Sequence, residues 1–109
     1  MDNIKIFFLD DTTLAEYEAV NKGYRIDIFV EIDEKFYNVR AYSLIRLQQD
    51  YETEMEASGF YYTEPNMIIV RDANKEEIVY AINRHYKGKY FDGIKSVQNM
   101  NLEKLTQVQ

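Results

Sequence analysis

Three acidic residues on one predicted strand face come closest to a catalytic arrangement. Asp27, Glu31 and Asp33 recur at even spacings, with Lys35 just beyond them. Carboxylates placed in this way beside a lysine can hold Mg²⁺ in nuclease-type sites. The same alternation is typical of any strand face that water solvates, and a chain with a net charge of −6 repels the phosphates that a nuclease must attract. We therefore interpret the face as solvated and keep a small metal-dependent hydrolase as the alternative.

The remaining residues predict neither an enzyme nor a bound cofactor or metal. The single histidine, His85, falls near the end of a predicted helix, and its sequence neighbours include no obvious catalytic partner. The four glycines stand apart from one another, whereas phosphate loops and dinucleotide fingerprints need them clustered. The chain lacks a Gly-x-Ser-x-Gly elbow, and it has no cysteine for a thiol nucleophile, a disulfide or a Cys-ligated metal.

The excess negative charge is concentrated in one part of the chain. Residues 47–70 contain neither lysine nor arginine and have a net charge of −5, against −3 for residues 1–46 and +2 for residues 71–109. Pairs of acids four residues apart, such as Glu52 and Glu56, destabilise an isolated helix by about 0.2–0.5 kcal/mol each. Such a cluster suits a surface that attracts a basic protein partner.

The same segment is rich in aromatic residues, and acids flanked by tyrosines are typical of a protein-binding surface. Tyrosine offers a large contact area at a small entropy cost and is common at interfaces. If residues 60–62 form a strand, Tyr61 and Tyr62 point to opposite faces and only one of them faces outward. The predicted partner-binding residues are Asp50, Tyr51, Glu52, Glu54, Glu56, Tyr61, Tyr62 and Glu64. The alternative is a solvated helix face beside core tyrosines.

Hydrophobic periodicity and capping residues predict an α+β fold. The expected elements are a strand over residues 4–9 that is buried on both faces, a short helix over 14–20 capped by Thr12 or Thr13, an antiparallel hairpin of strands 24–33 and 36–42, a helix from Ser43 to Gly59, strand segments over 60–62 and 67–70, a helix capped by Asn74 and ended by Gly88, and an edge strand over 94–97. The segment over 67–70 is expected to be central.

Two details of these elements bear on the site. In strand 24–33 the even-numbered residues predict a buried face, whereas Arg25, Asp27 and Glu31 are expected to be exposed. On the helix that follows Ser43, an apolar residue recurs every three or four positions and forms a narrow stripe, made of Leu44, Leu47, Tyr51 and Met55.

Length and composition predict one domain over residues 1–109, mainly an antiparallel sheet with two or three helices packed on it, and a loosely ordered tail over 99–109. The start of the chain lacks the basic and apolar regions of a secretory signal. Its longest apolar runs are also far shorter than a membrane span. We therefore expect a soluble, cytoplasmic protein that binds neither membranes nor nucleic acid, and we leave open whether it forms a homo-oligomer.

Two segments resemble a known group of proteins. Residues 59–70, Gly-Phe-Tyr-Tyr-Thr-Glu-Pro-Asn-Met-Ile-Ile-Val, and residues 87–92, Lys-Gly-Lys-Tyr-Phe-Asp, together resemble small immunity proteins of bacterial polymorphic toxin systems, which are encoded beside secreted or contact-dependent toxins. The resemblance covers residues 24–92 and brings no catalytic motif with it. It implies a small, cytoplasmic, often acidic protein that binds tightly to the active domain of its toxin.

The leading hypothesis is therefore a binding protein that neutralises a cognate toxin with a basic surface by occluding its active domain. The hydrolase that uses Asp27, Glu31 and Asp33 is the first alternative, and metal binding would distinguish it. An intracellular regulatory or assembly subunit is the second alternative, and the neighbouring gene would distinguish that one.

Overall fold

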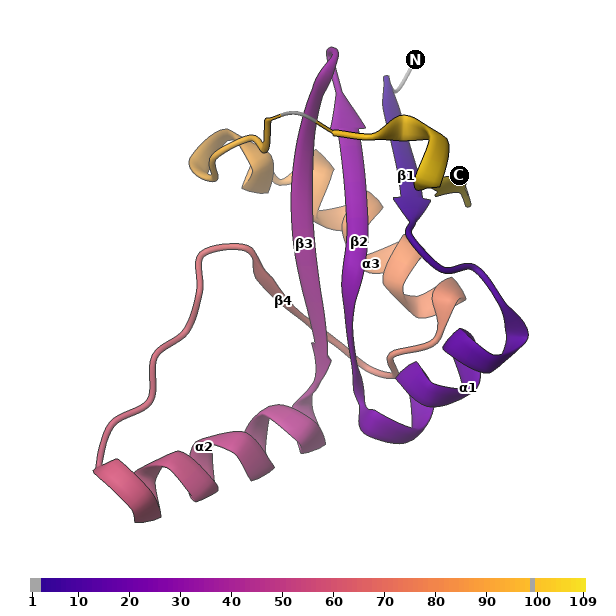
Figure 1. Ribbon diagram of the computed structural model, residues 1–109. Coiled ribbons are helices and arrows are strands. Elements are labelled where there is room, and N and C mark those ends of the chain that lie inside the picture. Colours follow the sequence, from indigo (N-terminus) through magenta and orange to yellow (C-terminus); the bar gives the residue numbers. More distant parts are fainter. Residues whose placement is uncertain (1–2, 99) are drawn as a thin grey trace.

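The chain folds around a five-stranded sheet flanked by helices (Figure 1). The computed structural model describes residues 3–98 and 100–109. Its elements are β1 (Ile4–Phe8), α1 (Thr13–Lys22), β2 (Tyr24–Ile32), β3 (Lys35–Ser43), α2 (Leu44–Ser58), β4 (Met67–Val70), α3 (Lys75–Lys87), the 3₁₀ turns η1 (Tyr90–Gly93) and η2 (Leu102–Lys104), and β5 (Thr106–Gln107). The strand order is β4-β3-β2-β1-β5; β3 and β4 are parallel, and the other three described pairs are antiparallel. The predicted α+β class and its mostly antiparallel sheet are confirmed.

The hydrophobic core lies between one face of the sheet and α3, which passes behind the strands in Figure 1. The largest fully buried side chains come from β1, β2, β3 and α3: Ile6, Phe8, Ile28, Val30, Val39, Ile78 and Ile82. Full burial of one such side chain contributes about 1.5–3 kcal/mol relative to its exposure. This contact therefore fixes the central strands, and the other elements are arranged around it.

The helix ends follow the capping residues in the sequence. Thr12, Ser43 and Asn74 each accept a hydrogen bond from a backbone N–H in the first turn of α1, α2 and α3, respectively. Gly23 and Gly59 end α1 and α2 with φ angles of 79° and 71°, the left-handed region that glycine adopts without strain. The predicted starts and ends of these helices are thus confirmed.

The β2–β3 hairpin is confirmed, and it closes through a two-residue turn. Ile32 pairs with Lys35, which leaves Asp33 and Glu34 between the strands. Both turn residues are left-handed, with φ angles of 50° and 68°. Two consecutive residues with positive φ are what the right-handed twist of a tight hairpin demands.

The start of β2 departs from the predicted alternation. The β2–β3 register shifts between Arg25 and Ile28, as it does at a β-bulge. Arg25, expected to be exposed, is buried with 4% of its surface accessible, whereas Ile26, expected to be buried, is 45% exposed. Beyond the shift Ile28 and Val30 point into the core as predicted. The prediction for Arg25 and Ile26 is wrong because a bulge inserts one residue and so reverses the faces of the side chains before it.

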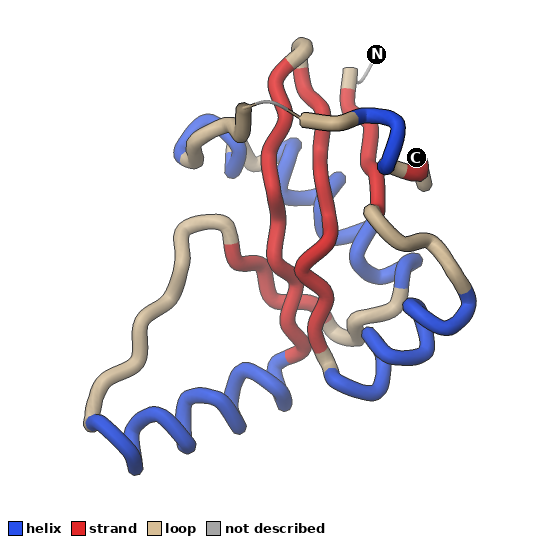
Figure 2. The backbone as a smooth tube through the Cα atoms, in the orientation of Figure 1, coloured by secondary structure: helices blue, strands red, loops and turns tan. Residues whose placement is uncertain are grey.

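Two apolar segments are less buried than predicted. β1 is buried on one face alone, because Lys5 on its other face is exposed. β4 forms an edge of the described sheet rather than its centre, and its Ile69 is exposed. Residues 60–62 form no strand, because this part of the chain is a loop that returns from α2 to β4 (Figure 2).

The C-terminal region also differs from the prediction. In place of an edge strand over residues 94–97, Val97 forms a single bridge to Phe36. β5 pairs with β1 through residues of the expected tail, and the N–H of Val108 donates to the carbonyl of Ile6 at 2.8 Å. Residues 106–109 of the expected tail are therefore attached to the sheet, whereas residue 99 of that tail lies outside the described residues.

Candidate protein-binding surface

The predicted partner-binding residues lie on α2 and the loop behind it, residues 44–66, which we call the acidic arm. α2 continues from the end of β3 and extends away from the sheet (Figure 2). None of its fifteen residues is buried. Most helices in proteins are stabilised by packing an apolar face, and α2 packs little of its own against this domain. Its side chains are therefore accessible to a partner.

The base of the acidic arm is fixed by Arg46. Its guanidinium lies over the ring of Tyr24, 4.9 Å from the centroid, and donates to the carbonyl of Lys22 at 3.4 Å. Tyr24 in turn stacks on Tyr42, with 5.6 Å between the ring centroids. Gly23 allows this approach, because a Cβ atom there would lie 2.9 Å from the Cβ of Arg46. These contacts join the first turn of α2 to the α1–β2 connection.

The returning end of the acidic arm is held to the rest of the domain by two side-chain hydrogen bonds. The hydroxyl of Tyr90 donates to the carbonyl of Pro65 at 2.9 Å. The side-chain amide of Asn66 donates to the carbonyl of Asn38 at 3.2 Å. Partial burial raises the pKa of Tyr90 above its usual value, so its hydroxyl keeps its proton over a wider pH range. The arm is thus attached at both ends and open between them.

The structure divides the predicted acids of the arm into two groups. Asp50 forms an ion pair with Arg46 at 3.1 Å, and Glu64 forms one with Arg40 at 3.6 Å. Glu52, Glu54 and Glu56 are exposed and form no ion pair within the described residues. The first group anchors the arm, and the second group provides its unneutralised charge.

The predicted tyrosines also differ in their surroundings. Tyr51 and Tyr61 pack edge to face with 5.8 Å between their ring centroids. Partial burial and the nearby Asp50 carboxylate raise the pKa of Tyr61. Tyr62 is 66% exposed. One tyrosine of the adjacent pair therefore packs on α2 and the other faces outward, although no strand separates them.

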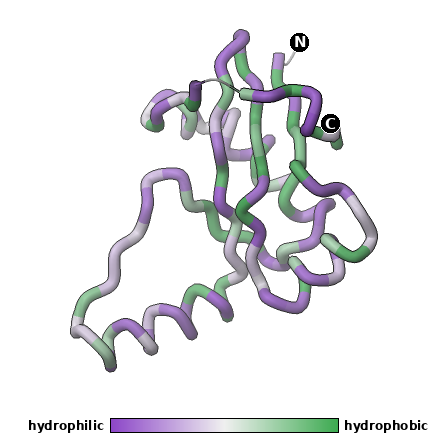
Figure 3. The backbone as a smooth tube through the Cα atoms, viewed as in Figure 1, coloured by the Kyte–Doolittle hydropathy of each residue, from purple (hydrophilic) through white to green (hydrophobic). Residues whose placement is uncertain are grey.

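Exposed apolar side chains on the arm add residues that we did not predict as partner-binding. Leu44, Ile45, Met55 and Phe60 are all exposed, and hydrophobic and hydrophilic stretches alternate along α2 in Figure 3. The apolar stripe is visible in the sequence, but the sequence does not show that the domain leaves it uncovered. Several large apolar side chains left exposed on one helix and the loop behind it favour a surface that binds another protein.

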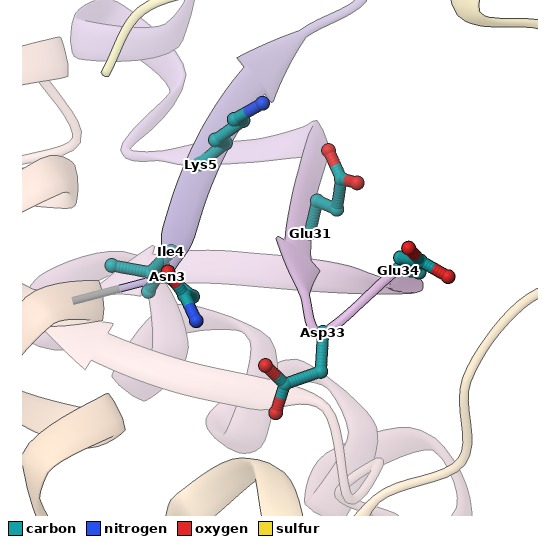
Figure 4. A pocket seen from close by; sticks show the side chains of 6 residues that line it. All are labelled: Asn3, Ile4, Lys5, Glu31, Asp33 and Glu34. Carbon is teal, nitrogen blue, oxygen red and sulfur yellow. The ribbon is translucent and has the colours of Figure 1, made fainter. Parts of the chain in front are cut away.

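The three acids of the hydrolase hypothesis make different contacts and do not point into one common site. Asp27 accepts two hydrogen bonds from the Arg25 guanidinium and one from the backbone N–H of Asp10. Glu31 lies opposite Lys5 in the β1–β2 register and, with Asp33, lines a shallow pocket at the end of the hairpin. Figure 4 shows the carboxylates of Glu31, Asp33 and Glu34 pointing in different directions. Across residues 3–98 and 100–109, no three His, Cys, Asp or Glu side chains are grouped as metal ligands.

His85 makes two contacts, one within α3 and one with the ring of Tyr90. Its Nδ1 lies 2.8 Å from the carbonyl oxygen of Ala81, one turn earlier, and its ring packs edge to face on Tyr90 at 5.0 Å. These contacts use the imidazole to position Tyr90, which holds the acidic arm.

No protein-family model matches this chain, and neither the curated proteins nor the solved structures include a significant match. In the part of the chain that the structure describes, no helix has both the length and the apolar character needed to cross a membrane. The geometry of the acidic arm is therefore the main basis for a functional argument.

Proposed function

We propose that this protein is a toxin-neutralising binding protein whose acidic arm docks on a basic surface of a cognate toxin and blocks access to the toxin's active domain. The observation that carries the proposal is that α2 has no buried residue, although it bears both an apolar stripe and unpaired acids. A helix of this kind is accounted for if a partner covers it.

The unpaired acids support the choice of a basic partner. Glu52, Glu54 and Glu56 lie within two turns of α2, where their like charges repel. No lysine or arginine lies in these two turns to offset the repulsion. Opposite charges on a partner would relieve this repulsion and accelerate the encounter. Association should therefore be fast and should slow as the salt concentration rises.

The test uses the toxin encoded by the neighbouring gene and the double variant Glu52→Lys/Glu56→Lys. Cells that express the toxin should survive with the parent protein, whereas the variant should protect poorly. In vitro, association at low salt should slow by about ten-fold or more, since exposed interface charges act chiefly on the association rate. Both positions are exposed and unpaired, so the melting temperature should stay close to that of the parent.

The matched control is Asp92→Lys/Glu103→Lys. Both residues are exposed and lie in η1 and η2, outside the acidic arm, and their replacement changes the net charge by the same amount. This control should retain protection. If both double variants protect as well as the parent, the acids of α2 are a solvated face and the proposed site is wrong; if the parent itself fails to protect, the proposed function is wrong.

A further inference from the structure

The apolar stripe of α2 runs along one side of the helix, and three of its four side chains are exposed, whereas Leu47 is half-buried. Leu44, Tyr51 and Met55 recur at spacings of seven and four, which places them on one face of an α-helix. Their exposed fractions are 59%, 48% and 39%. From Leu44 to Met55 this stripe is about 16 Å long at 1.5 Å per residue.

Acidic residues flank this stripe on both sides. Glu52 and Glu56 lie four residues apart on one flank, and Asp50 and Glu54 lie four residues apart on the other. On the second flank, Arg46 neutralises part of the negative charge by pairing with Asp50. Tyr61 also packs against Tyr51 on that side and covers part of it. The flank of Glu52 and Glu56 is open and unneutralised by the described residues.

The helix is already formed before any partner binds. Ser43 caps its start, Gly59 ends it, and Arg46 joins its first turn to the domain. A preformed helix avoids the entropy cost of folding on binding, so more of its contact energy appears as affinity.

We propose, on the basis of the function proposed above, that the toxin surface contains an apolar groove with lysine or arginine along its rims and that α2 enters this groove as a rigid helix. Leu44, Tyr51 and Met55 fill the floor of the groove, and Glu52 and Glu56 meet its more basic rim. This is the helix-in-groove mode of recognition, in which one amphipathic helix supplies both anchors and steering charge.

Charge favours such a partner over a second copy of this chain. Two α2 helices packed against each other would place six unpaired glutamates in one interface, three from each copy. Like charges brought together cost free energy that an apolar stripe of three residues would have to offset. A basic groove instead removes the repulsion within α2.

The experiment measures dissociation from the active domain of the neighbouring-gene toxin, inactivated in its own active site, by surface plasmon resonance. The test variant is Leu44→Ala/Tyr51→Ala/Met55→Ala, which removes the three exposed side chains of the stripe and introduces a good helix former. The control is Leu14→Ala/Tyr17→Ala/Val20→Ala, which removes three exposed apolar side chains from α1. The test variant should dissociate at least about 100-fold faster and the control within about three-fold of the parent.

The outcomes separate this inference from the proposed function. If the parent binds and the α2 variant dissociates within three-fold of it, the groove is wrong while toxin binding stands. If the parent does not bind the toxin, the proposed function is wrong, and the proposed groove is wrong as well. Sedimentation of the parent alone completes the test, since a dimer that the α2 variant converts to a monomer would show that a second copy covers the stripe. If the triple variant melts at a lower temperature than the parent, the single variant Met55→Lys decides, because it would bury a positive charge in the apolar floor between two basic rims and must speed dissociation.

Discussion

Replacement of Arg25 should reveal how strongly one buried cation holds the domain together. Arg25 donates from Nε to Asp27 at 2.7 Å and from Nη2 to the carbonyl of Asp10, and its guanidinium carbon lies 3.8 Å above the ring of Phe8. Its side chain is 4% exposed, so these contacts are shielded from water. The residue connects β2 to β1 and to the loop before α1.

The magnitude of the effect follows from these contacts. Removal of one member of a buried ion pair costs about 3–5 kcal/mol, and loss of the cation–π contact adds about 1–2 kcal/mol. Asp27 is 23% exposed and keeps its hydrogen bond from the N–H of Asp10, so water screens part of its unpaired charge. We therefore expect Arg25→Ala to lower the free energy of unfolding by about 3 kcal/mol, which is a large share of the typical 5–15 kcal/mol of a domain.

The assay is urea unfolding with linear extrapolation. Arg25→Lys keeps the charge but lacks the fork of donors, so its loss should be intermediate. Arg71→Ala is the control, because Arg71 pairs with Glu77 at the surface with 84% of its side chain exposed, where water and salt screen the pair. An Arg25→Ala loss no larger than that of the control would refute the reasoning.

Two further predictions concern the attachment of the acidic arm. Burial raises the pKa of Tyr90, so the neutral phenol stabilises the fold fully below pH ~10, and this stabilisation is lost as the pH rises through the raised value. Thermal melting from pH 8 to 11 should therefore fall less steeply for Tyr90→Phe than for the parent, and equal slopes would contradict the assignment. Gly23→Ala should cost at least about 1 kcal/mol more than Gly59→Ala. Both glycines have positive φ, but a Cβ at Gly23 would meet Ser43 at 2.8 Å, whereas a Cβ at Gly59 meets nothing within 4 Å; urea unfolding that shows equal losses would mean that Ser43 and Arg46 move aside freely.

The parts of the fold that the sequence predicts well are those with local causes. The helix starts depend on a side chain and an N–H three residues apart, as Asn74 and Glu77 illustrate at 2.8 Å. The hairpin depends on two alternating runs around a short turn. The hairpin and the ends of α2 follow from such signals.

The errors have causes that are not local. The reversed faces of Arg25 and Ile26 come from a β-bulge, which is a property of the pairing between β2 and β3 rather than of either sequence. The edge position of β4 depends on where the chain returns after α2, and an apolar composition alone does not fix it. The candidate site shows the same division, because acids and tyrosines can be counted in the sequence, whereas the ion pairs that remove Asp50 and Glu64 from the free charge require the fold.

Charge repulsion weakens α2, the helix of the acidic arm, whereas contacts at both ends of the arm hold it in place. Unpaired glutamates four apart weaken α2 by a few tenths of a kcal/mol per pair, and the helix gains little packing in return. Caps at both of its ends, Arg46 at its base and Tyr90 at its return offset this weakness without covering its apolar side. A helix that served the fold alone would gain more by packing that side on the sheet, as α3 does with Ile78 and Ile82. The arrangement of α2 instead preserves an exposed surface in a fixed shape, which is the property that a tight protein-binding site requires.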